Sequence, residues 1–489
     1  MDTRPVVVIG NGPVGQTTAL LLARWGVPVL LLDALTRREL VGSRSICQQR
    51  EALDVWASVG GGHRIADEGV TWRVARTYFR EHELFALTFA DPGRSPFPPW
   101  VNIGQARVEA LLDERIAEAP EIEVRWGHRV TGLTQGEDGV ELAVETPDGP
   151  ARIATPYVVA CAGAHADGIR GALGLDFAGT SFDDRFLICD IRTDLPDREL
   201  ERRFHFDPEW NPGRQVLIHP CPDSVYRIDW QVPADFDLAA EETSGALDER
   251  IRAVVGDRPY EVVWRTVYRF HARRASRMRA GRVLLAGDCA HLMAPFGARG
   301  LNSGVADADN AAWRIAFALH GWGEGERLLE GYDTERRAAA AENLAVTTRT
   351  MDFLVPQTAE GRAHRLDVLE RAVTDPEARA EIDSGRLYAP VRYGADAHPA
   401  VGAILPDHPV GDSRLRELAR RGLLLLATDP VEPPETDLPL TTLVLPPDLA
   451  DELGVRPGEV WVVRPDAYVA AVMSRDGVVR AIEQLLRGR

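Results

Sequence analysis

Three glycines near the start of the chain have the spacing of a turn that binds phosphate. Gly10, Gly12 and Gly15 follow the apolar run "VVVI" and lead into a helix-like stretch, "PVGQTTALLLARW". In such a turn the first glycine permits a tight bend, the second lets the backbone approach a pyrophosphate, and the third allows close packing of helix and strand. The helix would start at Pro13 and Val14, where free N–H groups and the positive end of the dipole favour bound anions.

The acid Asp33 completes this first unit. It ends a second apolar run, "VPVLLL", at the place where a carboxylate accepts a hydrogen bond from a ribose hydroxyl. Strand, glycine turn, helix, second strand and acid together predict a dinucleotide site at the N-terminus of the chain. These residues alone do not distinguish FAD from NAD.

A second glycine-rich stretch, "GDCAHLMAPFGARGLNSG", runs from Gly287 to Gly304. It lies between an apolar run, "RVLLA", and a helix-like stretch with one apolar face, at Val305, Ala308, Ala312, Ile315 and Leu319. The sequence contains no second complete unit of strand, GxGxxG turn, helix and acid. That absence disfavours a reductase with two dinucleotide domains.

Length, composition and charge narrow the class of protein. A chain of 489 residues with 45% hydrophobic residues is long enough for two or three units with their own cores. The net charge of -18, without a basic cluster, disfavours nucleic acid and anionic membranes as partners. No apolar run of about 18 residues occurs, so no transmembrane helix is expected. The first nine residues, "MDTRPVVVI", fit a buried strand better than a signal peptide.

The cysteines predict a cytoplasmic protein. They are odd in number and none is close to another in sequence: Cys47, Cys161, Cys189, Cys221 and Cys289. This pattern is typical of reduced thiols, with neither a disulfide framework nor a metal site.

Further motifs follow the first glycine turn in a set order. They are "GSRSICQQREALDVW", "VNIGQARVEALLDERIAEA", "TPYVVACAGAHADGIRGALG" and the Gly287 stretch. In this order they resemble the single-component FAD-dependent aromatic hydroxylases, the group A flavoprotein monooxygenases with the p-hydroxybenzoate hydroxylase fold. The resemblance covers residues 1 to about 345 and is greatest to the phenol and 3-(3-hydroxyphenyl)propionate hydroxylase branch.

The resemblance implies a cofactor role for each matching position. Gly10, Gly12 and Gly15 would hold the FAD pyrophosphate, and Asp33 the adenosine ribose. The other matches are Arg44 and Gln105 for the phosphate and ribitol region, Val130 for the adenine, Asp288 for the ribitol, and Pro295, Gly300, Leu301 and Asn302 for the wall beside the isoalloxazine ring. The helix that starts near Leu301 would direct its amides at the reduced flavin. The second stretch would thus hold the other end of the same FAD.

Two positions depart from the family pattern. Ala162 stands where the family has an aspartate associated with FAD and the nicotinamide cofactor, and Asp167 in the following loop is the available substitute. The choice between NADH and NADPH stays open. Arg299 stands where the family has a glutamine at the edge of the ring. It would stabilise reduced flavin, contact an acidic substrate or face solvent, and it is the one catalytic candidate that the sequence offers.

Strand patterns between residues 178 and 275 predict an antiparallel sheet with one face toward a pocket, and the resemblance implies that this sheet lies above the flavin. Alternation in "RQVLIHP" and "YRIDWQV" puts His219 on one face of its strand, and Trp230 opposite Asp229 on the next. The candidate substrate residues are His205, Arg214, His219 and Trp230. We interpret Arg227 and Asp229 as a structural pair, and no residue is identified as a base for a phenol.

These patterns predict an α/β fold: a Rossmann-type FAD-binding domain, an inserted antiparallel β substrate domain and a C-terminal thioredoxin-like domain. The FAD-binding domain would take residues 1–177 and 276–396, and the substrate sheet residues 178–275. Pro and Gly mark residues 397–413 as a linker. Residues 414–489 resemble the thioredoxin-like tail of the phenol hydroxylase branch but contain no cysteine for thiol exchange. Packing or assembly is the expected role of this tail.

The resemblance implies a FAD-dependent monooxygenase that hydroxylates a phenolic or polyketide aromatic substrate through a C4a-hydroperoxyflavin. O2 would be a co-substrate and NAD(P)H would bind transiently. The flavin would carry the bond chemistry, while the protein positions the ring and excludes water. Two alternatives stay open: a Baeyer–Villiger, epoxidising or antibiotic-modifying flavin monooxygenase, and, because of Ala162, a non-catalytic flavin- or ligand-binding protein. The identity of the substrate and assembly into a homo-oligomer also stay open.

Overall fold

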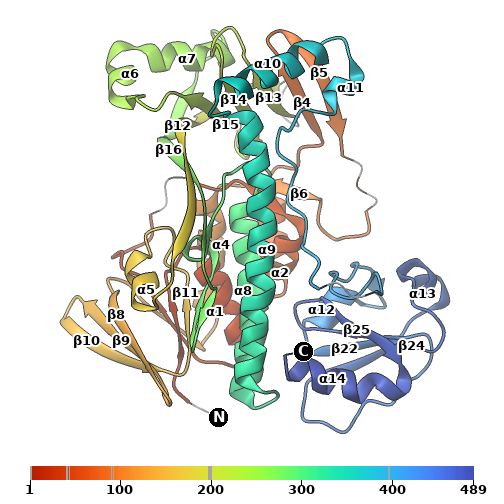
Figure 1. The fold of residues 1–489 in the computed structure, drawn as a ribbon. Coiled ribbons are helices and arrows are strands. Elements are labelled where there is room, and N and C mark those ends of the chain that lie inside the picture. The colour runs from red at the N-terminus through yellow and green to blue at the C-terminus, as the bar shows by residue number, and fades with distance from the viewer. Residues whose placement is uncertain are drawn as a thin grey trace.

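A computed structural model describes residues 3–39, 42, 44–89, 91, 93–196, 201–394 and 397–488. Its first large element is a six-stranded sheet in the order β17-β18-β11-β1-β2-β7 (Figure 1). In that order the strands are Arg279–Ala280, Val283–Leu285, Val158–Ala160, Val6–Ile9, Val29–Leu32 and Ile122–Arg125. β18, β11, β1 and β2 pair in parallel and are buried throughout, as expected of apolar runs without a polar face.

Four helices connect this sheet with the rest of the molecule. They are α1 (Pro13–Arg24), α4 (Gln105–Ala117), α8 (Arg299–His320) and α9 (Gly325–Leu354). α1 contacts both α4 and α8, and α8 lies along α9. At ~1.5 Å per residue, the 30 residues of α9 let it run upright in Figure 1 as far as the second large sheet.

The second large sheet has eight strands in the order β19-β16-β12-β15-β14-β13-β4-β5. They are His291–Leu292, Glu261–Ala275, Phe177–Arg192, Val225–Val232, Gln215–Cys221, Glu201–Phe206, Val74–Phe79 and His82–Thr88. All neighbours pair antiparallel except β13 and β4, which are parallel. The sheet therefore includes strands from outside residues 178–275, and β19 belongs to the second glycine-rich stretch.

The two faces of this sheet pack against different partners. One face, here called the outer face, carries Ile228 and Trp230 and is covered by α7 (Ala246–Val255). The other face, here called the inner face, carries Phe186 and Phe204. These side chains belong to a hydrophobic core that also includes Phe296 and, from the end of α9, Met351 and Leu354. The inner face is therefore the one turned toward the second glycine-rich stretch.

Smaller elements complete the structure. The sheet β10-β9-β8 is formed by Gly149–Thr155, Gly139–Thr146 and Arg129–Gly136, and β3 (Cys47–Gln49) pairs with β6 (Trp100–Asn102). The remaining helices before the tail are α2 (Arg50–Ala57), α3 (Gly62–Glu68), α5 (Asp167–Ala172), α6 (Leu238–Ser244), α10 (Ala359–Ala372) and α11 (Pro376–Arg379). Within the described ranges, no helix has the length and apolar character needed to cross a membrane.

The tail has a four-stranded sheet in the order β23-β22-β24-β25. Its strands are Leu440–Val444, Leu423–Ala427, Glu459–Val463 and Val469–Ser474, and its helices are α12 (Leu415–Ala419), α13 (Pro447–Leu453) and α14 (Val478–Leu486); a short hairpin, β20 (Pro409–Val410) with β21 (Ser413–Arg414), precedes them. β22 and β23 are parallel, and the other two pairs are antiparallel.

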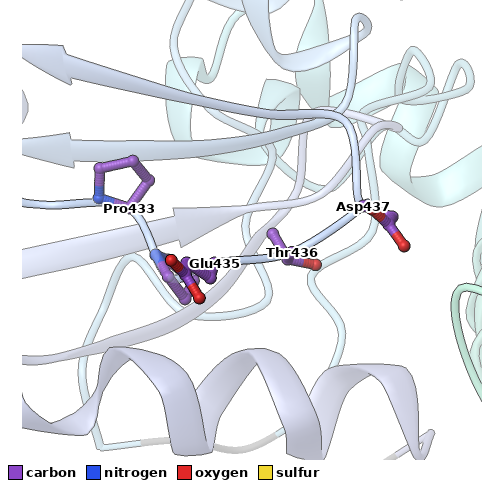
Figure 2. Close-up of a pocket in the computed structure, with 5 residues that line it drawn as sticks. Pro433, Glu435, Thr436 and Asp437 are labelled. Atoms are coloured by element: carbon purple, nitrogen blue, oxygen red, sulfur yellow. The ribbon is translucent and has the colours of Figure 1, made fainter.

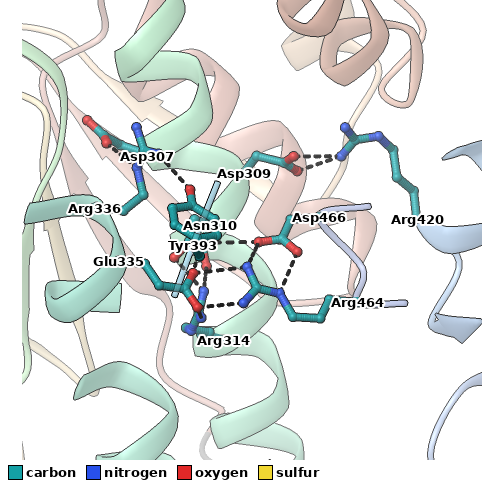
Figure 3. A network of polar contacts seen from close by, with 10 residues as sticks. All are labelled: Asp307, Asp309, Asn310, Arg314, Glu335, Arg336, Tyr393, Arg420, Arg464 and Asp466. Carbon is teal, nitrogen blue, oxygen red and sulfur yellow. Dashed lines mark hydrogen bonds and ion pairs between the residues drawn. The ribbon is translucent and has the colours of Figure 1, made fainter. Parts of the chain in front are cut away.

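Buried ion pairs dock the tail on α8 and α9 (Figure 3). Arg420, 2% exposed, donates to both oxygens of Asp309 at 2.7 and 2.8 Å and to Asp54 at 3.1 Å. Arg464 bonds Asp466 at 2.6 Å and Glu335 at 3.0 Å. Between them lies a cavity of about 30 Å³, which has room for water but not for an organic ligand.

Replacing Arg420 with Met should destabilise the protein by about 3–5 kcal/mol, because two carboxylates would stay buried without their cation. Arg421→Met is the matched control, since the adjacent Arg421 makes only an exposed pair with Glu417 and its loss should cost less than about 1 kcal/mol. Urea unfolding of the FAD-loaded protein, followed by circular dichroism, measures both. Equal effects of the two substitutions would contradict the assigned role of Arg420.

Candidate active site

The first glycine turn is shaped by two of its three glycines and leaves the third facing open space. Gly10 has φ +102°, and a Cβ there would lie 2.4 Å from the Cys161 carbonyl oxygen. A Cβ at Gly15 would lie 1.8 Å from the carbonyl oxygen of Gly10. At Gly12, by contrast, a Cβ would meet no atom within 4 Å. The turn therefore keeps a space at the N-terminus of α1 that the protein does not fill.

The two glycine-rich stretches meet directly at Val14. A Cβ at Gly304 would lie 2.6 Å from Val14 Cγ2, and one at Gly287 would lie 3.0 Å from the same atom. Only glycine lets the Val14 methyl group pack so closely at both positions. The second stretch thus continues the site that the first one opens.

The predicted ribose and adenine residues lie at the end of β2. Asp33 accepts hydrogen bonds from the backbone N–H of Asn11 at 2.7 Å and of Leu35 at 2.8 Å. The N–H of His128 donates to the carbonyl of Asp33 at 2.7 Å, which brings the start of β8 and Val130 to this place. A carboxylate oxygen can accept a further hydrogen bond, so Asp33 can still receive a hydroxyl.

Arg38 lies against the same turn and was not predicted. Its Nη2 donates to Asn11 Oδ1 at 3.0 Å, its Nη1 pairs with Glu109 Oε2 at 3.0 Å, and its Nε bonds Asp113. Burial would lower the pKa of Arg38, but the two carboxylates raise it, so the cation is held firmly. An arginine shortly after the acid of a dinucleotide unit was the available signal.

The predicted ribitol residues come together around Asp288. Gly287 and Cys289 are buried, but the side chain of Asp288 is exposed. The protein around it still raises the pKa of its carboxyl by desolvation, and the charges of His291 and Arg44 lower it. The N–H of Gln105 donates to the Ser45 carbonyl at 3.0 Å, next to Arg44.

Asp307, which was not predicted, fixes the backbone that carries Asp288. Its fully buried carboxylate accepts from the Gly287 N–H at 2.9 Å, lies 2.7 Å from His291 Nε2 and pairs with Arg336 Nε at 2.7 Å. Burial would raise the pKa of Asp307, but Arg336 and His291 outweigh it and lower the pKa. The signal for this role was an acid on the helix face that also carries Ala308 and Ala311.

In the predicted ring wall, Gly300 borders open space and Asn302 is held by hydrogen bonds. A Cβ at Gly300 would meet nothing within 4 Å. Asn302 is buried; it donates to the carbonyls of Cys47 and Ala298 at 3.0 and 2.7 Å and accepts from the Gln49 N–H at 2.9 Å. Asn302 therefore joins the first turn of α8 to β3. Pro295 is exposed and Leu301 is partly buried beside them.

Arg299 does not face solvent, which excludes one of its three predicted alternatives. It is 4% exposed and donates to Asn343 Oδ1 at 2.6 Å and to the carbonyl of Arg386 at 2.9 Å. Its hydrogen bonds fasten the segment around Arg386 to the start of α8. This arrangement assigns Arg299 a structural contact that the sequence did not indicate.

Asp167 is directed to solvent. Its side chain is 87% exposed and pairs with Arg170 at 2.7 Å. Arg170 is itself buried and donates to the carbonyl of Cys289 at 3.0 Å. A Cβ at Gly163, beside Ala162, would meet nothing within 4 Å. The loop thus keeps a third open position next to the Asp288 turn, without an acid in it.

The residues present fit an elongated dinucleotide. Gly12, Gly163 and Gly300 leave open space that no packing requirement explains, and the N-termini of α1 and α8 suit anionic groups. Asp33 and Asp288 supply carboxylates for hydroxyl groups, and Arg44 a cation for phosphate.

Comparison with known proteins agrees with this donor set. Residues 3–347 match the family described as "FAD binding domain". The chain belongs to this family. A 3-(3-hydroxy-phenyl)propionate/3-hydroxycinnamic acid hydroxylase of Mycolicibacterium smegmatis is 30% identical over 409 residues, which cover 83% of this chain and 71% of that protein. The family resemblance inferred from the sequence is therefore confirmed, and the protein is a FAD-dependent monooxygenase of the aromatic hydroxylase class.

Solved structures share the arrangement along the whole chain. The OxyS anhydrotetracycline hydroxylase from Streptomyces rimosus is 27% identical, with a TM-score of 0.73 over 99% of both chains. The flavin-dependent monooxygenase PieE, solved with FAD and substrate, has a TM-score of 0.82 at 21% identity over 99% of both chains. FAD is thus the cofactor of this flavoprotein, and the mixed α/β fold is that of the flavin hydroxylases.

The inner face of the eight-stranded sheet rests on the second glycine-rich stretch. Phe296 packs against Phe186 and Phe204, with ring centroids 5.7 and 6.4 Å apart. The side chain of Asn102, in the strand paired with β3, donates to the carbonyl of Pro220 on β14 at 2.8 Å. The inner face therefore adjoins the first turn of α8 through both Phe296 and β3.

The four predicted substrate residues are not brought together. His219 is on the inner face, whereas Trp230 is 0% exposed in the core beneath α7. His205 stacks on Tyr78 and contacts Trp210, on the outer face. Arg214 lies after the end of β13 and pairs with Asp184 at 3.5 Å. Strict alternation along each strand separates these side chains, so only His219 faces the flavin half.

Arg227 pairs directly with Asp190, and its predicted partner Asp229 makes only a longer-range charge interaction with it. Arg227 makes two parallel hydrogen bonds to Asp190, at 2.8 and 2.9 Å. The strand register explains why Arg227 bonds Asp190 and not Asp229. Asp190 lies directly opposite Arg227 on the neighbouring strand, whereas Asp229 is two residues along the same strand. A direct cross-strand neighbour is closer than the next residue on the same face.

Polar side chains without partners gather on the inner face. Arg202 is 8% exposed and lies over the Phe204 ring, 5.8 Å from its centroid, but has neither a hydrogen bond nor an ion pair among the described residues. His219 Nδ1, Asp229 Oδ1 and both side-chain polar atoms of Gln48 and Gln215 are buried without a hydrogen-bond partner in the described ranges. Buried polar atoms usually have partners, so this cluster points to a ligand.

A hollow in the tail does not belong to this site. It lies in the loop between β22 and β23 (Figure 2) and is lined by Pro433, Pro434, Glu435, Thr436 and Asp437. These five residues supply two carboxylates, a hydroxyl and no cation, a set without the donors that an anionic cofactor requires.

Substitution of Gly12 by Ala should weaken FAD binding at least about tenfold, or ~1.4 kcal/mol, while the protein stays folded. The added methyl group would occupy the open space but meet no protein atom. Gly171→Ala, also open but on the exposed side of α5, should leave the affinity unchanged. Titration of the apo-protein with FAD by fluorescence quenching measures both. Wild-type affinity in the Gly12 variant would show that the phosphates lie elsewhere.

Proposed function

We propose that this monooxygenase hydroxylates a phenolic aromatic substrate that carries an acidic group, with O2 and NAD(P)H as co-substrates. The observation that carries the proposal is the buried, unpartnered Arg202 beside His219 and Asp229. A buried guanidinium keeps its charge and requires an anion. Relatives named for a phenylpropionate and a hydroxycinnamic acid act on phenols with a carboxylate, which supports this substrate class.

Each part of the site has a separate task in this proposal. FAD, when bound, supplies the acceptor for the hydride of NAD(P)H and the site of oxygen activation. Gly12 and the N-terminus of α1 hold its pyrophosphate, Asp33 its ribose and Asp288 its ribitol. The amides at the start of α8, near Gly300, stabilise negative charge on the ring.

The remaining cofactor assignments follow the same order along the site. Arg44 and Gln105 serve the phosphate and ribitol region, Val130 the adenine, and Pro295, Leu301 and Asn302 the ring wall. The inner face of the sheet orients the substrate and excludes water from it.

The domain assignment belongs to the same proposal. Residues 1–177 and 276–396 form the FAD-binding domain, residues 178–275 supply most of the substrate sheet, and residues 397–413 link to the tail. The sheet order and the single parallel pair of residues 414–489 support a thioredoxin-like fold. A loop replaces the helix between β22 and β23, and the tail has no cysteine, so docking rather than thiol exchange is its role.

Substitution of Arg202 by Met should raise the KM for 3-(3-hydroxyphenyl)propionate about 30- to 1000-fold, corresponding to ~2–4 kcal/mol for a buried charge pair. The KM for the neutral analogue 3-propylphenol should change little, because this compound has no carboxylate that could pair with Arg202. Substrate-stimulated NAD(P)H oxidation by the FAD-loaded protein gives both values.

Arg203→Met is the matched control, since Arg203 is adjacent in sequence but pairs with Glu201 at 3.0 Å. Equal losses for the acid and the neutral phenol would contradict the role of Arg202. If no phenol stimulates NAD(P)H oxidation by the wild type, the proposed function itself is wrong.

A further inference from the structure

Asp229 lies on the inner face, and its carboxyl makes no ion pair with a cation among the described residues. Its neighbours across the sheet are Leu217 on β14 and Ile188 on β12, both buried. The side chain is partly buried, and Oδ1 is enclosed without a hydrogen-bond partner among the described residues. Asp190, by contrast, accepts two hydrogen bonds from Arg227. One carboxyl thus completes an ion pair, while the other has an unused acceptor.

We infer that Asp229 takes the proton of the substrate's phenol group. The inference rests on the proposed hydroxylation of a phenol and supplies the base that the sequence did not reveal. With the acidic group of the substrate on Arg202, two strands away, the aromatic ring lies along the inner face and its hydroxyl reaches Asp229. A proton acceptor must be within hydrogen-bond reach of the proton that it removes, and the partly buried Asp229 carboxylate has an unused acceptor.

The charges around Asp229 come from every element packed against it. The titratable groups near it are Arg227 on the same strand, Asp190 and Cys189 on β12, Arg202 on β13, and His219 and Cys221 on β14, and Cys47 on β3 lies near Arg202. Burial raises the pKa of Asp229 to about 7, with Asp190 raising it further and Arg227 and Arg202 opposing. Asp229 is therefore an ionised acceptor above about pH 7 and a neutral carboxyl below it.

The other titratable groups of the inner face are unsuited to this task. Burial, together with Arg202 and Arg227, lowers the pKa of His219 well below its usual value, so a proton on its ring would sit between two cations. Burial raises the pKa of the Cys47 and Cys221 thiols to about 12, and they stay protonated. His219 can still donate or accept a hydrogen bond as a neutral ring.

The step balances within the proposed hydroxylation. As the ring carbon forms its bond to the transferred oxygen, the O–O bond breaks, and the second oxygen keeps that electron pair, takes up protons and leaves as water. The phenol O–H bond breaks at the same time, and its proton passes to the Asp229 carboxylate. The electron pair of that bond conjugates into the ring. On rearomatisation the ring C–H proton leaves to solvent, and Asp229 returns its proton to the phenolic oxygen. The oxidant is O2 and the two electrons come from NAD(P)H through FAD, as in any flavin monooxygenase.

The test is Asp229→Asn in the FAD-loaded protein, with 3-(3-hydroxyphenyl)propionate as the probe. We expect kcat to fall about 10²- to 10⁴-fold and the loss of activity below about pH 7 to disappear. Flavin reduction by NAD(P)H should be unchanged, because it precedes the proton transfer. Ring-fluorinated analogues of the probe, whose hydroxyl is more acidic, should recover part of the rate. Asp229→Glu, which keeps a carboxylate, should retain the acidic limb of the profile.

A second readout does not depend on turnover. In pH-difference infrared spectra of the FAD-loaded protein, a protonated-carboxyl band should titrate near pH 7 in the wild type and be absent in Asp229→Asn. Asp223→Asn is the control, since Asp223 is exposed in the turn between β14 and β15 at φ +61°, which asparagine tolerates.

An unchanged pH profile and an unchanged infrared band in Asp229→Asn would overturn the inference even if the wild type hydroxylates phenols. If no phenol stimulates NAD(P)H oxidation by the wild type, the proposed function is overturned instead. The infrared band would still report the titration of Asp229.

Discussion

The buried carboxylate of Asp307 is the contact on which the site depends. It holds the Gly287 N–H, the ring of His291 and the Arg336 guanidinium at one point. Arg336 in turn donates to the hydroxyl of Tyr393 at 2.7 Å, in the segment that leads to the tail. Without the cation, Asp307 would be an unpaired charge in the core, and without Asp307 the backbone N–H of the flavin turn would lose its partner. Three parts of the chain therefore depend on one ion pair.

Local patterns were sufficient for the N-terminal dinucleotide unit, from β1 to Asp33. The buried run at β1, the glycine turn and the acid Asp33 each act through residues close in sequence, so their spacing predicted strand, turn and helix correctly. The eight-stranded sheet was less predictable, because β4 and β5 come from before residue 90 and β4 pairs with β13 across a long sequence separation. Alternation predicts which residues share a face, but not which distant strand is the neighbour.

The candidate site divides along the same line. The resemblance brought Asp288, Arg44 and Gln105 to one place, and the structure also places them close together. Arg202 gave no signal in sequence, and Asp229 was interpreted only as a structural partner of Arg227. Both residues stand out because they make no ion pair among the described residues. Asp229 makes none because the strand register places Arg227 opposite Asp190. In the proposed site, substrate specificity therefore depends on cross-strand pairing and not on sequence motifs.

The length of α9 has a consequence for how the molecule responds to ligands. This single helix carries Arg336 at the flavin turn, Glu335 at the tail and Leu354 in the core beneath the inner face. The helix is unbroken between Glu335 and Leu354, so a ligand at the inner face that displaces Leu354 would also change the contacts of Glu335 with the tail. By thermodynamic linkage, any effect of the docked tail on substrate affinity equals the effect of substrate on docking. The docking of the tail would then depend on which ligand the flavin half has bound.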